Sequence, residues 1–231
     1  MIKQIPNAIT CANLFSGCIG IVYAFNGNLT GAAYFVLLSG LFDFFDGFAA
    51  RLLKVKSEMG KELDSLADVV SFGFLPGVVL YQMLLVVYPL NSFIPFFAFF
   101  VTIFSALRLA KFNIDTRQSN DFIGLNTPMN TLVTVSFPFL ANTYPDLIYN
   151  PITLVIWIAI SCILLISEIR FFSLKFEGLS WGANKFKFSF LFLTLVAIIL
   201  WQFKSAPIIL ALYMLFSLMH FGKKIMAEKI K

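Results

Sequence analysis

The sequence predicts an all-α integral membrane protein, a polytopic helix bundle with about eight transmembrane helices and both termini in the cytoplasm. Two observations predict this class. Hydrophobic residues make up 59% of the 231-residue chain against 13% charged residues, and the apolar residues fall into long runs. Ordinary soluble domains contain about 25% charged residues, because they must cover their core with polar groups. The composition therefore excludes a soluble globular enzyme, a disordered chain and a secreted disulfide scaffold.

Turn-forming residues divide the apolar runs into helices. A membrane-spanning helix needs about 20 apolar residues, and Gly, Pro and Asn clusters such as Asn26-Gly27-Asn28 interrupt the runs at that spacing. The expected spans are 8–26, 30–53, 66–88, 91–112, 127–143, 151–169, 186–203 and 206–222. The weakest of them is 127–143, which is short and contains two prolines.

The basic residues indicate the orientation. When the eight spans alternate from a cytoplasmic N-terminus, all but one of the 17 Lys and Arg residues fall on the cytoplasmic side, and Lys204 is the exception. Such an excess is typical of cytoplasmic loops in multi-pass proteins. We therefore expect the net charge of +5 to serve an anionic membrane surface, in the cell (inner or cytoplasmic) membrane, and we expect no nucleic-acid partner.

Four aspartates lie where an apolar helix should exclude them. Asp43 and Asp46 are three residues apart in the second expected span, so they share one helix face. Asp64 and Asp68 are four apart at the start of the third and do likewise. Each charge at the centre of a membrane helix costs about 2.5–3.5 kcal/mol. An ion pair with Arg51, or contact with lipid headgroups, is the simpler alternative for the first pair alone.

The two helices form a hairpin, so all four carboxylates can point into one space. Like charges a few Å apart do not all stay ionised without cations. Ligands made only of oxygen favour Mg²⁺ or Mn²⁺, and Ca²⁺ is also compatible with them. Two such ions about 3.5–4 Å apart clamp a phosphoryl group during displacement. We therefore predict that Asp43, Asp46, Asp64 and Asp68 bind two divalent metal ions.

Small and basic neighbours fit a phosphate-bearing substrate. Gly47, Ala50 and Gly60 leave space beside the aspartates, and the Arg51 guanidinium offers a fork of donors to phosphate oxygens. The alternative for the small residues is close helix packing, which is common in membranes.

The combined pattern is D-x-x-D-G-x-x-A-R-x8-G-x3-D-x3-D, running from Asp43 to Asp68. It resembles the signature of the CDP-alcohol phosphotransferase family at every fixed position. The resemblance implies a dimeric membrane enzyme in which residues 1–231 form a single membrane domain. Residues 1–170 would be the catalytic six-helix core, and 171–231 an interfacial segment plus two additional C-terminal helices. It also implies that Asp68 completes the metal site and is the general base on the acceptor hydroxyl.

The resemblance further implies a binding site for the cytidine diphosphate group. Its expected residues are Asn7, Thr10, Asn13, Gly47, Ala50, Arg51, Gly60 and Ser65. The first three recur every three residues along the first helix and form one polar stripe. Helix capping and interhelical hydrogen bonds are the alternative role for this stripe. Pro76 is expected to kink the third span and widen the cavity.

Two further segments indicate which alcohol is the acceptor. The run from Leu107 to Asn113, together with the one from Asp121 to Pro128, is similar to the subfamily that uses L-serine, with departures at Lys111 and Asn126. The likeness implies that Arg108 and Lys111 bind the donor phosphates or the serine carboxylate, and that Asn113 contacts the acceptor. Positive charges that anchor a cytoplasmic helix end are the alternative for the two basic residues.

The expected reaction transfers the phosphatidyl group of CDP-diacylglycerol to the hydroxyl of L-serine and releases CMP. One alternative is an enzyme of the same family with glycerol 3-phosphate or inositol phosphate as acceptor. Another is a cation-coupled membrane transporter, in which intramembrane aspartates bind the transported ion. Such transporters repeat their binding motifs in both halves, whereas here the acidic cluster occurs once.

Overall fold

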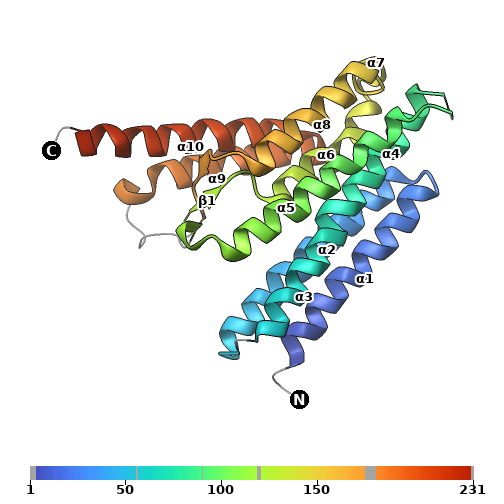
Figure 1. Cartoon of the computed structure of the whole chain (residues 1–231). Coiled ribbons are helices and arrows are strands. Elements are labelled where there is room, and N and C mark those ends of the chain that lie inside the picture. Colours follow the sequence, from blue (N-terminus) through green and yellow to red (C-terminus); the bar gives the residue numbers. More distant parts are fainter. Residues whose placement is uncertain (1–3, 56, 90, 119–120, 175–180, 230–231) are drawn as a thin grey trace.

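The computed structural model describes residues 4–55, 57–89, 91–118, 121–174 and 181–229. These residues form a bundle of helices with one short two-stranded sheet (Figure 1). The first half contains α1 (Ile5–Phe25), α2 (Leu29–Leu52), α3 (Glu58–Asp68), η2 (Val69–Phe74), α4 (Leu75–Val87), η3 (Ile94–Phe99) and α5 (Phe100–Ile114). The second half contains η4 (Thr116–Gln118), β1 (Phe122–Ile123), α6 (Thr127–Ala141), α7 (Pro145–Ile148), α8 (Pro151–Ile166), β2 (Arg170–Phe171), α9 (Trp181–Trp201), η5 (Gln202–Ser205) and α10 (Ala206–Lys229).

Side-chain caps begin several of these helices. Asn28 accepts a hydrogen bond from the Gly31 amide at the start of α2, and Ser57 accepts one from the Gly60 amide at the start of α3. The second cap extends this helix beyond expectation: the expected third span begins at 66, whereas the helix begins at Glu58. The additional turns carry the polar residues of α3 out of the apolar part of the span.

Five segments among the described residues are long and apolar enough to cross a membrane. They are Ile5–Phe25, Leu29–Leu52, Glu58–Val87, Ile94–Ile114 and Asn184–Gly222, while Pro151–Ile166 is apolar but shorter. Many large apolar side chains point outward, such as Phe15 at 68% exposure and Ile199 at 70%. An apolar exterior of this kind suits lipid. The prediction of an all-α, multi-pass membrane protein is therefore confirmed, while the count of eight spans and the orientation stay predictions.

The last two long helices differ from the rest of the bundle. Figure 1 shows α9 and α10 lying side by side and extending away from the helices α1 to α5. The expected interfacial segment before them falls partly on 175–180, which lies outside the described residues. Its beginning is strand β2, which pairs with β1 in antiparallel register. The sequence reading expected no strand, because a two-residue strand carries no periodic signal.

A π-helical segment interrupts the third span just before Pro76. Proline lacks an amide hydrogen, so Pro76 cannot donate to the carbonyl four residues earlier. That residue is Phe72, which lies in the π-helical segment. That carbonyl accepts a 2.6 Å hydrogen bond from the Thr131 hydroxyl of α6 instead. The Gly73 carbonyl similarly accepts one from the Thr102 hydroxyl at 3.0 Å. The structure thus has a π segment just before Pro76, with two carbonyls bound to side chains of neighbouring helices, while the predicted kink and wider cavity stay predictions.

Candidate metal and nucleotide site

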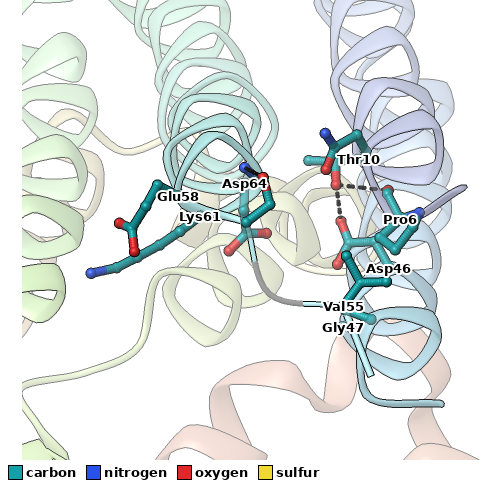
Figure 2. Close-up of a pocket in the computed structure, with 12 residues that line it drawn as sticks. Pro6, Thr10, Asp46, Gly47, Val55, Glu58, Lys61 and Asp64 are labelled. Atoms are coloured by element: carbon teal, nitrogen blue, oxygen red, sulfur yellow. Dashed lines mark hydrogen bonds between the residues drawn. The ribbon is translucent and has the colours of Figure 1, made fainter. Parts of the chain in front are cut away.

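A cavity of about 400 Å³ opens between the first turns of α1, the end of α2 and the start of α3 (Figure 2). Twelve residues line it: Pro6, Asn7, Thr10, Asp46, Gly47, Ala50, Val55, Ser57, Glu58, Gly60, Lys61 and Asp64. Seven of these twelve residues are among those expected from the sequence to bind metal or nucleotide. The signature and the polar stripe of α1 therefore meet at one cavity. The hairpin of α2 and α3 produces this convergence, since it brings the end of one helix beside the start of the next.

Three of the four expected metal ligands form a cluster. Asp43, Asp64 and Asp68 each offer a carboxylate oxygen, and these oxygens all lie within 4.8 Å of one another. Asp68 is the most deeply placed of the three, with 8% of its surface exposed. The helix-face argument from the sequence is therefore correct for these three residues.

Asp46 is placed differently from the other three aspartates. It lies outside that cluster, and its Oδ2 accepts a 2.7 Å hydrogen bond from the Thr10 hydroxyl, as the dashed line in Figure 2 shows. Asp46 is buried and lines the cavity, as does Asp64 on the facing helix. It is thus available to a ligand in the cavity but not grouped with the three clustered carboxylates in this structure.

The α1 stripe orients the acidic residues. Asn13 donates from Nδ2 to Asp68 Oδ1 over 3.2 Å, and its backbone carbonyl accepts hydrogen bonds from the Ser39 and Ser71 hydroxyls. The Asn13 Oδ1 atom is buried without a partner among the described residues. Thr10 and Asn13 therefore act on Asp46 and Asp68 through interhelical hydrogen bonds, the role that the sequence reading left as the alternative to nucleotide contact. Asn7 and Thr10 line the cavity, and the nucleotide role stays a prediction for all three residues of the stripe.

Close packing explains one glycine of the signature. A Cβ atom on Gly60 would lie 3.0 Å from Asn7 Oδ1, tighter than ordinary contact. A larger residue would require the Asn7 side chain to move by a few tenths of an ångström at the wall of the cavity. Gly60 therefore leaves space for the Asn7 side chain as well as for a ligand.

The donor set fits divalent metal ions. No ion pair between described residues involves any of the four aspartates, and the protein cation that interacts electrostatically with one of them, Asp68, is the buried Arg108. Several carboxylate oxygens at one point, without histidine or cysteine, are the ligands that Mg²⁺ and Mn²⁺ prefer. The residues present thus suit the metal predicted from the sequence.

Residues expected around the nucleotide are only partly brought together. Gly47 and Ala50 line the cavity, but Arg51 is exposed and is not among the lining residues. Its Nη1 atom lies 3.4 Å from the position that a Cβ on Gly47 would occupy, so the side chain folds back over α2. Ser65 accepts a 2.8 Å hydrogen bond from the Asn113 side chain, which places both at the junction of α3 and α5.

Lys61 is a cavity residue that the sequence reading missed. It lines the cavity and donates to the Asn113 backbone carbonyl over 3.0 Å. The signal was present in the motif, because Lys61 stands between two fixed positions, Gly60 and Asp64, on the first turns of α3. From the sequence alone, Lys61 is expected only to be one of the basic residues on the cytoplasmic side.

Arg108 is a buried cation with free donors. Only 6% of its surface is exposed, and Nε and Nη2 have no partner among the described residues. Nη1 donates to the Thr127 hydroxyl at 3.4 Å, and the guanidinium lies 5.0 Å from the centre of the Phe112 ring and 6.0 Å from that of Phe122. It also interacts electrostatically with Asp68. A buried guanidinium with unused donors is a site for an anion.

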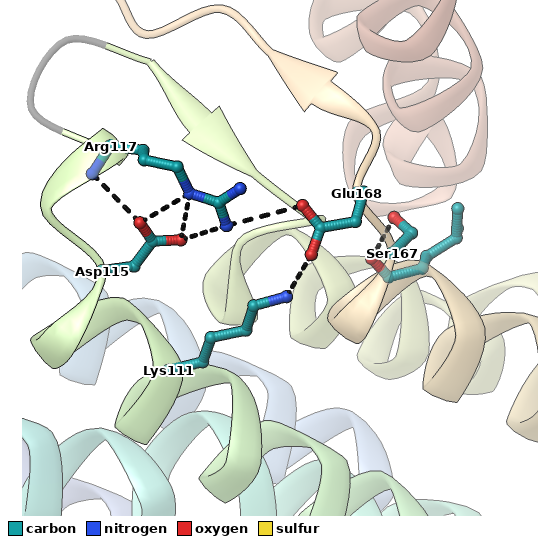
Figure 3. Close-up of polar contacts among 6 residues, drawn as sticks. Lys111, Asp115, Arg117, Ser167 and Glu168 are labelled. Atoms are coloured by element: carbon teal, nitrogen blue, oxygen red, sulfur yellow. Dashed lines mark hydrogen bonds and ion pairs between the residues drawn. The ribbon is translucent and has the colours of Figure 1, made fainter.

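Lys111 has a different environment, although the sequence reading paired it with Arg108. Its ammonium group forms a 2.5 Å ion pair with Glu168, and Arg117 joins the same cluster through Asp115 and Glu168 (Figure 3). The hydrogen bond from Lys111 lowers the pKa of Glu168 from its usual value. Since the Lys111 and Glu168 side chains are 38% and 63% exposed, this is a solvated pair that joins α5 to the segment after α8. Lys111 is therefore already paired in this structure, and both its substrate-binding role and the anchoring alternative stay predictions.

Comparison with known proteins agrees with this geometry. The family model described as CDP-alcohol phosphatidyltransferase matches residues 3–165 of the chain. The chain belongs to this family. All four aspartates, the lining residues of the cavity and Arg108 fall inside the matched region.

Several proteins of known name are similar to this chain in sequence. The chain is 36% identical over 169 residues to CDP-diacylglycerol–serine O-phosphatidyltransferase of Bacillus subtilis, covering 73% of this chain and 90% of the relative. It is 32% identical over 216 residues to the protein of the same name in Helicobacter pylori, covering 92% and 89%. Archaetidylserine synthase of Methanothermobacter thermautotrophicus is 32% identical over 170 residues, covering 72% and 69%.

Proposed function

We propose that this CDP-alcohol phosphatidyltransferase transfers the phosphatidyl group of CDP-diacylglycerol to the hydroxyl of L-serine, giving phosphatidylserine and CMP. One observation carries the proposal: Asp43, Asp64 and Asp68 form a carboxylate cluster, without a direct ion pair to any described residue, next to a cavity at one end of the bundle. The names of the relatives in Bacillus subtilis and Helicobacter pylori support serine as the acceptor.

The metal ions belong to this proposal. Asp43, Asp64 and Asp68 would hold them, with Asp46 as a further ligand at the cavity wall. When bound, two divalent ions supply positive charge that binds the donor diphosphate and stabilises charge that develops on the transferred phosphoryl group.

Asp68 is the best placed general base. Asn13 donates to one of its carboxylate oxygens, which fixes the orientation of the group and leaves Oδ2 to accept the proton of the serine hydroxyl. As this proton moves to Asp68, the serine oxygen forms a bond to the phosphatidyl phosphorus, the bond from that phosphorus to the CMP oxygen breaks, and CMP leaves with the bonding electrons.

Arg108 is the proposed binding residue for an anionic group of the substrates. Its unused Nε and Nη2 donors match the two oxygens of the serine carboxylate or of a donor phosphate.

We also propose that the cavity faces the cytoplasm, because the loops expected to be cytoplasmic are rich in Lys and Arg. The enzyme would be a multi-pass homodimer in the cytoplasmic membrane. The acyl chains of CDP-diacylglycerol would lie against the apolar exterior of the helices.

A direct assay tests the reaction. We expect the purified protein in lipid micelles to release CMP from CDP-diacylglycerol when L-serine and Mg²⁺ or Mn²⁺ are present. Chelation should stop the release, and either metal should restore it. Phosphatidylserine is identified as the second product by mass spectrometry, and Asp146→Asn, an exposed aspartate in α7, serves as a matched control for Asp64→Asn.

The same assay separates the alternatives. Glycerol 3-phosphate and inositol phosphate carry an additional phosphate that needs additional cations, yet Lys61 is the one basic residue among those described as lining the cavity. If CMP is released with glycerol 3-phosphate but not with serine, the proposed acceptor is wrong and the family chemistry is retained. If no CMP is released and the protein instead carries cations into vesicles, the transporter alternative is supported.

A further inference from the structure

The C-terminal helix α10 contacts the core through strand β2. The Tyr213 hydroxyl donates a 2.8 Å hydrogen bond to the Phe172 carbonyl, and the Phe172 amide donates to Ser217 Oγ over 3.4 Å. Tyr213 and Ser217 are four residues apart, so they share one face of α10, and both are buried. The residue after β2 is thus held to α10 through both of its backbone polar groups. All of these residues lie beyond the part matched by the family model, which ends at residue 165.

Strand β2 transmits this attachment to β1. Phe171 pairs with Phe122 in the antiparallel register, and the Tyr213 ring packs against Phe171 and Phe172 with centroids 5.0 and 5.1 Å apart. Tyr213 and Phe122 also line a second cavity of about 340 Å³. The position of the Phe122 ring therefore depends on contacts that α10 makes with β2.

Phe122 in turn contacts Arg108. Its ring centre lies 6.0 Å from the guanidinium carbon, within the range of a cation–π interaction, and Phe112 contributes a second ring at 5.0 Å. Since Arg108 has one long hydrogen bond and two unused donors, contact with these aromatic rings can influence where its donors point.

We propose that Tyr213 and Ser217 are positioning residues for Arg108. They hold β2, and through β1 the Phe122 ring, so that the guanidinium keeps the orientation that binds the anionic group of the acceptor. The inference rests on the proposed role of Arg108. It assigns a function to α10, for which no role is predicted from the sequence.

A second attachment of β1 makes the inference testable without unfolding the site. The Gly124 amide donates to the Ile169 carbonyl at 2.8 Å, and the Leu125 amide donates to that of Leu164 at 2.9 Å. Gly124 has a φ of +78°, and a Cβ atom there would lie 2.6 Å from the Leu165 carbonyl oxygen, so this turn requires glycine. These bonds do not involve α10, so loss of the Tyr213 hydroxyl should leave the fold intact while it weakens the attachment of α10 to the residue after β2.

The test is steady-state kinetics of Tyr213→Phe, which removes the hydroxyl and keeps the ring. We expect the KM for L-serine to rise about 3- to 10-fold, as for the loss of one buried hydrogen bond. The kcat and the KM for CDP-diacylglycerol should change less than about twofold, because Asp68 and the carboxylate cluster are untouched. Tyr81→Phe, a similar change on α4, is the matched control, and Ser217→Ala is compared with Ser205→Ala in the same way.

A double-mutant cycle tests the route through Phe122. In a Phe122→Leu background, which itself raises the serine KM, Tyr213→Phe should have little further effect, because both changes act on the same ring. If wild type prefers another acceptor, the cycle uses the KM of that acceptor. Additive effects, or a Tyr213→Phe variant that behaves like Tyr81→Phe, would overturn the inference while the wild-type activity upholds the proposed function. A wild type that releases no CMP with any acceptor would overturn both.

Discussion

The acidic and the basic ends of the site region differ in how their charges are balanced. Asp43, Asp64 and Asp68 lie together inside the bundle, without an ion pair to any described residue. Lys111 is exposed at the end of α5 and is paired with Glu168. Uncompensated buried charge is costly, so a fold that keeps it has a ligand for it, whereas a solvated pair needs none.

Arg108 shows that sequence neighbours can fall on opposite sides of this distinction. It is three residues from Lys111 on the same helix, yet it is buried and keeps two free donors while Lys111 is solvated and paired. From this difference we expect Arg108 to bind a ligand and Lys111 to stabilise the fold. The predictions below test that rule.

Asp64→Asn should have the largest effect. Removing one charged ligand from the cluster forfeits several kcal/mol of transition-state stabilisation, which is about a thousandfold in kcat. Circular dichroism and thermal unfolding should show a folded protein, since the substitution preserves side-chain size. Near-normal CMP release from Asp64→Asn would remove this residue from the metal site, and Asp146→Asn should retain full activity.

Arg108→Gln should rank second. Hydrogen bonds to a charged group contribute about 1.5–3 kcal/mol, so we expect kcat/KM for the acceptor to fall about 10- to 100-fold. Arg117→Gln, on an exposed guanidinium paired with Asp115, is the control and should stay within about twofold of wild type in the same CMP-release assay. Equal losses in the two variants would break the distinction between buried and solvated cations.

Thr10→Val should have an intermediate effect. It deletes the hydroxyl that donates to Asp46 Oδ2 and keeps the shape of the side chain. Residues that orient metal-binding carboxylates typically affect activity about tenfold or more, so we expect a loss of about tenfold and a raised metal requirement in a Mg²⁺ titration. Thr10→Ser retains the donor and should restore most of the activity. If Thr10→Ser is as impaired as Thr10→Val, the hydrogen bond is not the cause.

Glu168→Gln should have the smallest effect, within about twofold on CMP release. Its stability effect should depend on pH, because Lys111 lowers the pKa of Glu168 in the folded state. A lowered folded-state pKa stabilises the protein above the usual glutamate pKa, and this contribution disappears as the pH falls through the lowered value. Thermal unfolding of wild type and Glu168→Gln should therefore differ at neutral pH and converge in acid.

The sequence revealed the acidic site better than its surroundings, for a physical reason. Helical spacing alone places Asp64 and Asp68 on one face, and that local rule survives in any tertiary arrangement. The same rule placed Asp46 beside Asp43, but the contact with Thr10 turns it away from the cluster. That contact depends on how α1 packs on α2, which no spacing within one helix encodes.

The expectation for Arg51 shows a similar limit. Its place in the signature suggested a phosphate-binding donor, but in the structure it lies exposed over α2, outside the cavity lining. Long, flexible side chains at helix ends have many rotamers of similar energy, so sequence position does not determine their direction. Its nucleotide-binding role stays a prediction that rests on the family signature.

Composition, turn residues and helical periodicity are local properties of the chain, so they were sufficient to predict the membrane class, most helix boundaries and the carboxylate signature. Which charges are paired depends instead on the packing of the helices. It paired Lys111 with Glu168 across more than fifty residues, left Arg108 with unused donors, and brought Tyr213 of α10 to the strands beside it. Such contacts depend on long-range packing between helices, and a linear pattern does not contain them.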